Sequence, residues 1–440
     1  VKLQVAGYTG SETLENFPVL VRLSESGIPG FKYADLTNSK GKDIAFFDAA
    51  GNHLASEIET NAWKEVDSTS LVWVRLPEMT AGTKFYLCYN TSESGAWVEN
   101  DNPWGDYVGV WHMDEKGGQN TKIYDATTHE LHGVVKASGN NVSRYKNGAV
   151  GATRRIAVDK NHAWGIVVEA TNGLPQKAVA DSLGTDFTAS FWMNPQSGDV
   201  TYGFLIDRRK GEYNNPGGWG TRLHTKPTLE VYAADEKPFS GNYDGTLSGN
   251  NYAALFTQNT WSKVDIHWHA TSETAGAADI YLNGAFVETV TLPNPPKQDD
   301  ANIGIGGSTQ LVPADNTEGK GRRFNGYMDE VRLRSGGLSA DWIKADYDTV
   351  NNGSFVTIAP PVVAWADAAG DTPGLSGVFF DSAVFAGMVK DCGGFASCAI
   401  QCKVWAAAGG EPDAWTTITN GLVADDVFSV RVPGLLSETD

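Results

Sequence analysis

Short segments rich in β-branched and aromatic residues recur along the whole chain, and this pattern limits the fold more than any other feature. Examples are "FPVLVRL", "SLVWVRLP", "FTASFWM" and "KVDIHWHA", each close to Gly, Pro, Asn or Asp. Such segments are typical of strands, and many short strands separated by turn residues are typical of β-sandwiches and jelly rolls. The best helical pattern is "LSADWIKADYDTV", with Ser339 as its N-cap. The sequence therefore predicts an all-β protein with little helix.

Linker-like stretches divide the 440 residues into three blocks. The segment "VENDNPWGDY" separates residues 1–98 from a larger block, 105–350, and "TIAPPVVAWAD" leads into residues 359–440. We expect a β-sandwich, a larger β domain and a small sandwich in that order. The last block ends about where such a sandwich would still need a final strand or two. Either the chain is cut there, or a neighbouring chain supplies the missing strand.

The charge balance excludes some partners. The chain has 34 Lys and Arg against 53 Asp and Glu, a formal net charge of −19. Such a surface repels phosphate backbones, so we predict no nucleic-acid partner, whereas it suits Ca²⁺, which prefers oxygen ligands. No apolar run of about 18 residues is present, which predicts no membrane span. We expect any signal peptide to lie outside these residues.

The four cysteines are unevenly placed. Cys88 stands alone in "KFYLCYN", while Cys392, Cys398 and Cys402 cluster near the end. Their spacing lacks the paired short intervals of a zinc site. Either one disulfide forms within the cluster in an oxidising compartment, or the cysteines are small buried hydrophobic residues. The sequence does not decide the pairing.

Two pairs of acidic residues are candidates for catalysis, but the position of each pair argues against that role. Asp329 and Glu330 are consecutive, so on a regular strand they point to opposite faces and cannot line one cleft without a bulge. We expect Asp329 to point inward and Glu330 to lie on the surface. Glu57 and Glu59 alternate in "SEIET", the spacing that a glycosidase needs, but they lie in the first block. We interpret them as ordinary residues of that block.

A histidine pair is a second candidate for chemistry. In "DIHWHA", Asp265, His267 and His269 share one strand face. They are either zinc ligands or the solvated face of a half-buried strand. The chain has no G-x-S-x-G elbow, no HExxH and no P-loop. The sequence predicts a protein that is not an enzyme.

Five motifs in order give the middle block its family resemblance. They are "GVWHMDE" (109–115), "DATTHELHG" (125–133), "FTASFWMNP" (187–195), "IYLNGAFV" (280–287) and "FNGYMDEVRLRSGGLSADWI" (324–343). Residues 105–350 resemble a laminin-G-like, concanavalin A-type jelly roll of bacterial surface proteins. This implies two packed antiparallel sheets with "GYMDEVRL" as an internal closing strand. Residues 1–98 resemble a family of unknown function that often precedes such jelly rolls, and residues 359–440 resemble a fibronectin-type or immunoglobulin-like sandwich.

The resemblance also implies a calcium ion between the first loop of the jelly roll and its closing strand. The family's loop reads Asp-Ser-x-Gly-Asn-Gly-x-His-Gly, and Asp125, His132 and Gly133 match it here. The small Gly-Asn-Gly centre is replaced by bulkier residues, which puts the ion in doubt. Asp125 and Asp329 are the expected ligands, with Asp114 as a further candidate. The alternative is that Asp329 accepts hydrogen bonds from loop N–H groups.

Aromatic residues and long polar loops suggest a binding surface. The chain has 14 Trp and 15 Tyr, and sugars stack their apolar faces on such rings. The densest polar and aromatic loop is "DRRKGEYNNPGGWGTRLHTK", residues 207–226. The predicted ligand contacts are Arg208, Tyr213, Trp219 and Arg222. The alternative is that Trp219 packs on its own domain.

These features together predict part of an extracellular, multidomain protein of the cell surface. Its expected role is adhesion, through a jelly roll that binds a glycan or another surface protein. A first alternative is a structural fibre or spacer subunit that assembles head-to-tail. A second alternative is a hydrolase that acts on glycans.

Overall fold

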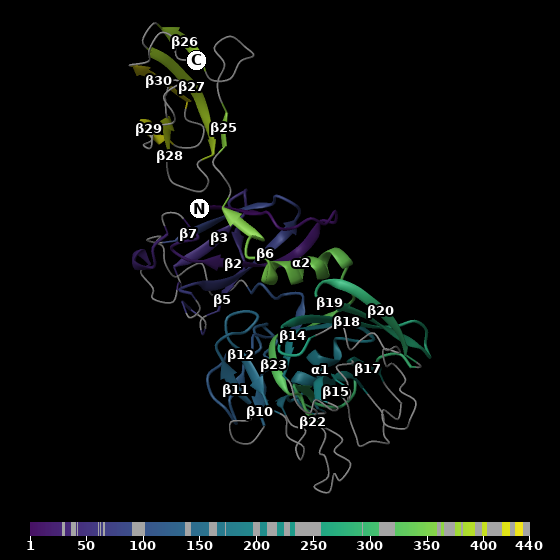
Figure 1. Ribbon diagram of the computed structural model, residues 1–440. Coiled ribbons are helices and arrows are strands. Elements are labelled where there is room, and N and C mark those ends of the chain that lie inside the picture. The colour runs from purple at the N-terminus through teal and green to yellow at the C-terminus, as the bar shows by residue number, and fades with distance from the viewer. Residues whose placement is uncertain are drawn as a thin grey trace.

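The computed structural model describes the chain in defined segments. These are residues 1–89 (without 29–30, 37–40, 42, 60, 62 and 65–66), 102–136, 142–157, 165–196 (without 172), 203–208, 218–223, 229–233, 257–307 (without 293) and 322–358. Beyond residue 358 it describes only the strands. The strands of these residues form six sheets (Figure 1). Among the described residues, no helix has the length and apolar character needed to cross a membrane.

The first domain is a sandwich of two antiparallel sheets. The smaller sheet has the order β2 (Leu14–Leu23), β6 (Ser70–Met79) and β5 (Ser56–Ile58). The larger has the order β24 (Val356–Ile358), β1 (Lys2–Val5), β7 (Lys84–Tyr89), β3 (Ile44–Phe47) and β4 (His53–Leu54). A short 3₁₀ helix, η1, covers Tyr33–Asp35. Alternate apolar residues of the strands, Phe17, Phe46 and Phe85 among them, fill one buried core.

The jelly roll consists of two eight-stranded sheets. The β14 sheet runs β11 (Val142–Tyr145), β12 (Thr153–Ile156), β23 (Gly326–Ser335), β14 (Asp186–Pro195), β18 (Ser262–Ala270), β19 (Gly276–Leu282), β20 (Ala285–Leu292), with β8 (Tyr107–Trp111) beside β23. The β15 sheet runs β17 (Leu229–Ala233), β16 (Trp219–Leu223), β15 (Gly203–Arg208), β21 (Ile303–Ile305), β13 (Ile166–Val168), β10 (Gly133–Val135), β9 (Lys122–Ile123), with β22 (Arg322–Arg323) beside β15. A short helix, α1 (Gln176–Asp181), packs against its core through Val179 and Ala180.

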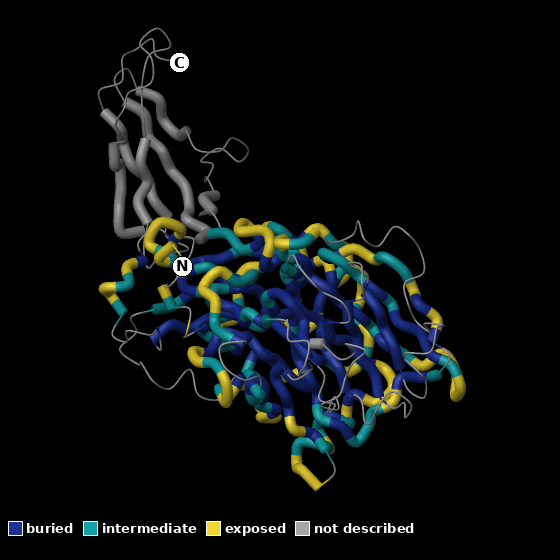
Figure 2. Tube along the Cα trace, turned by 60° about the horizontal axis from the view of Figure 1, so that its bottom comes forward, coloured by how far each residue is buried: buried dark blue, intermediate teal, exposed yellow. Residues whose placement is uncertain are grey.

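The core of the jelly roll lies between its two sheets, as the alternation of the strands predicts. In β18, Val264, Ile266 and Trp268 point into this core. Buried residues follow the strands of both domains, and exposed residues mark the loops around them (Figure 2). The all-β prediction is confirmed.

The closing strand β23 contains a β-bulge that the sequence did not reveal. Arg332 pairs with Ser190 and Asp329 with Trp192, so two residues of β23 face one residue of β14. Glu330, inside the bulge, has φ 48°, in the left-handed region. The bulge turns Glu330 inward, and only 2% of the residue is exposed. The prediction that Glu330 lies on the surface is therefore wrong.

The segment after the jelly roll returns to the first domain. Helix α2 (Ala340–Asn351) begins at the predicted N-cap, where Ser339 Oγ accepts a hydrogen bond from Trp342 N at 3.1 Å. The Trp342 ring lies edge-on to Phe17, with ring centroids 4.9 Å apart. Strand β24 then pairs with β1 and completes the larger sheet of the first domain. The first domain and the jelly roll are thus joined by packing, and not only by a linker.

The last block contains two further sheets. The first contains β25 (Val362–Ala364), β26 (Leu375–Phe379), β27 (Ser382–Asp391) and β30 (Val427–Pro433), and the second pairs β28 (Cys398–Cys402) with β29 (Thr416–Leu422). Cys392 lies outside the described residues, as do the side chains of Cys398 and Cys402. The disulfide and the immunoglobulin-like assignment therefore stay predictions.

Candidate functional site at the domain junction

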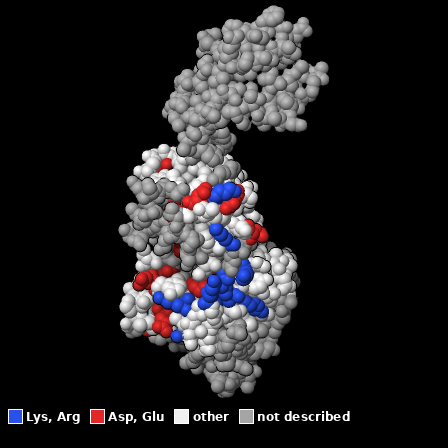
Figure 3. Space-filling model, turned by 90° about the vertical axis from the view of Figure 1, so that its left-hand side faces the viewer, with Lys and Arg blue, Asp and Glu red and all other residues white. Residues whose placement is uncertain are grey.

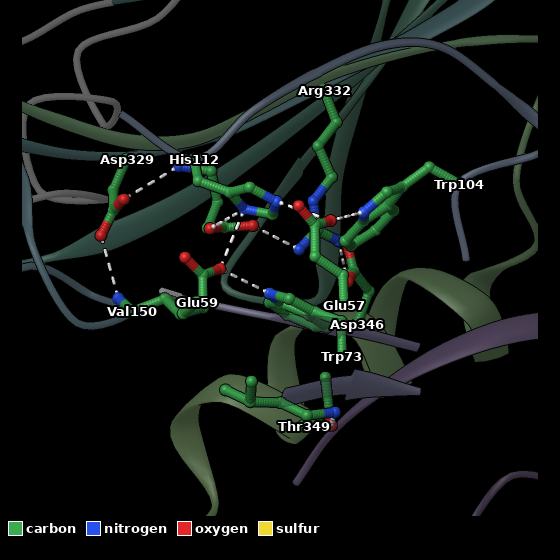
Figure 4. Close-up of polar contacts among 12 residues, drawn as sticks. Glu57, Glu59, Trp73, Trp104, His112, Val150, Asp329, Arg332, Asp346 and Thr349 are labelled. Carbon is green, nitrogen blue, oxygen red and sulfur yellow. Dashed lines mark hydrogen bonds and ion pairs between the residues drawn. The ribbon is translucent and has the colours of Figure 1, made fainter. Parts of the chain in front are cut away.

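A buried ionic network joins the first domain to the jelly roll. Its centre is His112, which follows β8 and is 9% exposed. Nε2 of His112 lies 3.2 Å from Glu57 Oε2, and Nδ1 lies 3.0 Å from Glu59 Oε1 (Figure 4). Two indole N–H groups hold these carboxylates, Trp104 on Glu57 and Trp73 on Glu59. The alternating pair of "SEIET" therefore contacts the jelly roll, with Glu59 buried and Glu57 partly exposed.

The bulge in β23 supplies the third carboxylate. Glu330 Oε1 lies 2.7 Å from His112 Nδ1, and Glu330 Oε2 accepts a hydrogen bond from Arg332 at 2.6 Å. Arg332 also donates to Asp346 of α2 at 3.0 Å (Figure 4). Lys263 of β18 reaches the same Asp346 at 2.9 Å. Both domains and α2 thus share one network of paired charges.

Burial and neighbouring charges set the protonation of this network. Burial alone would lower the pKa of His112, but the carboxylates around it outweigh burial and raise that pKa well above 6.5. Burial raises the pKa of Glu59 well above 4.5, and the neighbouring carboxylates add to that effect. Burial opposes the ionisation of Glu330, but His112 and Arg332 hold its pKa below 4.5. The imidazolium of His112 and the ionised form of Glu330 therefore stabilise each other, while burial disfavours the ionised form of Glu59.

This network stabilises the interface between the two domains. A general acid or base has to reach a substrate, whereas His112, Glu59 and Glu330 are each less than 10% exposed. The 2.7 Å contact between Glu330 and Nδ1 has the length of a charge-assisted hydrogen bond, and Glu59 lies 3.0 Å from the same nitrogen. Removing one partner would leave a buried charge without compensation. We therefore assign these residues to holding the two domains together.

A pocket of about 400 Å³ lies at the same junction. Both domains line it, the first through β2, β6 and the turn before β6, the second through the loop after β11: Leu20, Arg22, Asp67, Thr69, Leu71, Asn147, Gly148, Ala149, Val150 and Gly151. The guanidinium of Arg22 is fixed by the last carbonyls of α2, those of Thr349 and Val350. The pocket thus forms only when the two domains pack together, because each supplies part of its lining.

Asp329 positions the loop that forms the jelly-roll side of this pocket. Its Oδ2 accepts a hydrogen bond from Val150 N at 2.9 Å (Figure 4). A Cβ at Gly148 would lie 2.5 Å from the same oxygen, so the close approach requires glycine. Asp329 is therefore a loop anchor, which is one of the two roles that the sequence left open.

A cluster of aromatic rings and one guanidinium includes Tyr145, which precedes the pocket loop in sequence. Tyr145, two residues before Asn147, is 42% exposed, and its ring lies 4.7 Å from that of Tyr327. Trp261 lies 6.3 Å from Tyr327, and the Arg155 guanidinium lies 5.4 Å from the same ring. Lys and Arg side chains form a band across the jelly roll on the side of β11 and β12, although the whole chain is acidic (Figure 3).

The residues predicted to hold calcium already bind protein donors. Asp125 Oδ1 accepts hydrogen bonds from the N–H groups of Val110 and Thr127 at 2.9 and 3.0 Å. Its Oδ2 accepts from Thr127 Oγ1 at 2.7 Å and from Leu131 N at 2.8 Å. Four donors saturate a carboxylate, while calcium needs six to eight oxygen ligands. Asp125 therefore does not fit a calcium ion.

The other two predicted calcium ligands are also engaged. Asp114 Oδ1 accepts a hydrogen bond from Asn61 Nδ2 at 3.1 Å, and Asp329 holds the pocket loop. Among the described residues, two sets of His, Cys, Asp or Glu have ligand atoms within 4.8 Å of one another. Neither set contains Asp114, Asp125 or Asp329. The structure does not bring the three together as a ligand set.

Three of the four predicted glycan contacts lie on the β15 sheet, and all three are buried. Trp219 is fully buried, with its ring 4.8 Å from Phe187. Arg208, also fully buried, pairs with Asp181 of α1 at 2.7 Å, and Arg222 pairs with Glu230. The structure assigns these three side chains to internal packing instead of a ligand surface. Tyr213 lies outside the described residues.

Sequence reasoning missed the pocket because it lies between two domains. One local signal pointed to it: "SRYKNGAVG" places a tyrosine just before a loop of small residues and asparagine. No pattern in the sequence relates that loop to Arg22 or Asp67, which are more than 70 residues earlier in the chain.

A family comparison identifies the class of the middle block. Residues 169–344 match the Laminin_G_3 family model, described as the concanavalin A-like lectin/glucanases superfamily. The predicted concanavalin A-type jelly roll is confirmed over those residues. The protein is an all-β chain that carries a laminin-G-like, concanavalin A-like jelly roll.

Comparison with other proteins adds little beyond the fold. No curated protein matches the chain. Similar solved structures include the binding domain of Paraclostridial Mosquitocidal Protein 1 (15% identity, TM-score 0.38, 56% of this chain and 53% of that one). A Trypanosoma rangeli sialidase is also similar (13% identity, TM-score 0.39, 66% and 42%). The chain spans about half the length of these two structures. Likenesses at such TM-scores carry no functional argument.

Proposed function

We propose that this chain binds a glycan in the pocket between the first domain and the jelly roll. The observation that carries the proposal is the pocket itself, about 400 Å³ in volume and lined by two domains, with the partly exposed Tyr145 two residues before its jelly-roll loop. Ligand sites occur preferentially at domain interfaces, in clefts of roughly 300–1,000 Å³. A concanavalin A-like jelly roll is compatible with this role.

The lining suits a sugar chemically. The apolar face of a pyranose can stack on the Tyr145 ring, which is backed by Tyr327. Asp67, Thr69 and Asn147 offer hydrogen-bonding groups to hydroxyls. The band of Lys and Arg on this face favours a glycan that carries anionic groups (Figure 3).

The engagement of the nearby carboxylates supports binding rather than hydrolysis. Glu57 and Glu59 have the spacing of a glycosidase pair, but both contact His112 and both accept an indole N–H. Neither lines the pocket. A glycosidase needs an acid and a second carboxylate on either side of the scissile bond. We therefore infer that the chain holds its ligand without cleaving it.

Adhesion at the cell surface is the biological role that we propose for this binding. It rests on the resemblance of the domains to surface proteins and on the proposed pocket. Labelling of intact source cells with a membrane-impermeant reagent tests the location. A protein labelled only after lysis would contradict it.

A glycan array with the whole chain tests the binding itself. We expect hits among sulfated or carboxylated glycans, and at least a fivefold weaker signal for Tyr145→Ala, taking the loss of a stacking ring as about 1–3 kcal/mol by analogy with base stacking. Tyr124→Ala is the matched control, because Tyr124 is also an exposed tyrosine (56%) but lies near β9.

Two results would contradict the proposal. The first is an array without hits at any concentration of folded protein. The second is equal binding by wild type and Tyr145→Ala. Trp219→Ala is not a useful probe, since Trp219 is buried in the core and its loss would destabilise the jelly roll. Release of reducing ends from a bound glycan would favour the hydrolase alternative.

A further inference from the structure

Two histidines and one aspartate converge on the outer face of the β14 sheet, away from the pocket. His267 and His269 alternate along β18, and His267 pairs directly with Asp279 of β19. Two strands, β23 and β14, separate β18 from β12, which carries Arg155 beside the proposed glycan site (Figure 1). Asp265, which the sequence placed with these histidines, instead pairs with Lys263.

The distances between the three side chains match those of metal ligands. Asp279 Oδ2 lies 3.5 Å from His267 Nδ1 and 3.3 Å from His269 Nε2. All three ligand atoms lie within 4.8 Å of one another. Ligands about 2.0–2.1 Å from a tetrahedral zinc ion are separated by about 3.3 Å. A single ion can therefore contact all three atoms after small side-chain rotations.

The neighbouring residues orient these ligands. His267 Nε2 contacts Asp186 Oδ1 at 2.8 Å, which turns Nδ1 of the same ring toward Asp279. Thr289 Oγ1 donates a hydrogen bond to Asp279 Oδ1 at 2.5 Å, so the other oxygen, Oδ2, faces the histidines. A carboxylate on the second ring nitrogen is the usual support of a metal-binding histidine.

Backbone packing fixes the His267 ring further. A Cβ at Gly337 would lie 2.6 Å from the ring, so the backbone of Gly337 lies directly against it. The rings of His267 and His269 lie 4.7 Å apart at an interplanar angle of 23°. The ligand geometry is thus largely set before any ion binds.

Exposure distinguishes this set from the His112 network. The side chains of His267, His269 and Asp279 are 18%, 26% and 22% exposed, while the ligand atom His269 Nε2 is buried and has no hydrogen-bond partner among the described residues. The side chains of His112, Glu59 and Glu330 are 10%, 3% and 1% exposed and are held at hydrogen-bond distances. Of the two such sets among the described residues, the one on β18 and β19 is partly exposed and the other is buried.

We propose that His267 Nδ1, His269 Nε2 and Asp279 Oδ2 bind a divalent transition-metal ion, with Zn²⁺ as the reference ion and water as the fourth ligand. Imidazole ligands suit zinc, copper and nickel, whereas calcium and magnesium prefer oxygen. Three protein ligands leave one position open, so the ion can accept a ligand from solvent or from a partner.

Calorimetric titration of the whole chain with ZnCl₂ tests the proposal. We expect one site, at least tenfold weaker binding for His269→Ala and for Asp279→Asn, and 10- to 100-fold weaker binding for Asp186→Asn, which removes the support of His267. His53→Ala is the matched control, because it removes a partly buried histidine of the first domain. Its affinity for Zn²⁺ should equal that of wild type.

Replacing Zn²⁺ by Co²⁺ adds a readout of geometry. Tetrahedral Co²⁺ gives strong visible absorption, which should be lost in Asp279→Asn while circular dichroism confirms that this variant is folded. A tenfold excess of Ca²⁺ should not displace Co²⁺. Absence of Zn²⁺ binding at micromolar concentration, or equal binding by wild type and both ligand variants, would overturn the proposal.

Discussion

Trp342→Ala tests whether α2 is part of the first domain, although it follows the jelly roll in sequence. Trp342 is 6% exposed and belongs to the core of the first domain together with Phe17 and Phe355. The Arg334 guanidinium lies 4.6 Å from its ring. Truncation of a buried tryptophan to alanine costs about 3–5 kcal/mol. Since a tenfold change corresponds to about 1.4 kcal/mol, amide protection in the first domain should fall by about 10² to 4 × 10³.

Native-state hydrogen exchange with mass spectrometry is the appropriate assay. The peptides that cover β1, β2 and β7 should lose protection in Trp342→Ala, while those of β15 and β16 should change little. Trp268→Ala is the matched control, because Trp268 is fully buried in the core of the jelly roll. In Trp268→Ala, the peptides of β15 and β16 should lose protection, while those of β1, β2 and β7 should change little. If Trp342→Ala leaves the exchange of β1, β2 and β7 unchanged, the packing of α2 contributes nothing to the first domain and the reasoning is refuted.

Two further predictions concern the junction and the first loop of the jelly roll. The pKa of His112 is raised in the folded state, so its contribution to stability is complete below about pH 6.5 and is lost as pH rises through the raised value. The raised pKa of Glu59 acts in the same direction. The melting temperature should therefore fall above neutral pH, and it should fall less steeply in His112→Gln. Identical slopes for the two proteins would contradict the role of His112 in holding the domains together. Calcium should not change the melting temperature relative to a chelator, because protein donors saturate Asp125, and an upward shift in calcium would show that an ion displaces them.

Local patterns predicted the elements of this fold well. The alternation of "KVDIHWHA" gave β18 with Val264, Ile266 and Trp268 inward, and Ser339 caps α2 as expected. These features depend on side-chain periodicity and capping, which act within a few residues. For the same reason the sequence correctly placed His267 and His269 on one face.

The candidate site was predictable only in part. Asp329 was expected to point inward, and it anchors the pocket loop. Glu330 was expected on the surface, because strict alternation separates consecutive residues, and the β-bulge broke that rule. The Gly- and Asn-rich composition around Arg208 and Trp219 predicts an exposed binding loop. In the structure these residues belong to β15 and β16, which place them inside the domain.

The sequence by itself determined that this chain is all-β and where helix α2 begins, and its motifs gave the resemblance to a concanavalin A-like jelly roll. The first two properties follow from short-range patterns of apolar, polar and turn residues. Only the tertiary structure decided which distant residues meet: Glu57 with His112, Arg22 with the end of α2, and His269 with Asp279. Such contacts are set by the packing of whole sheets and domains, and no local periodicity records them.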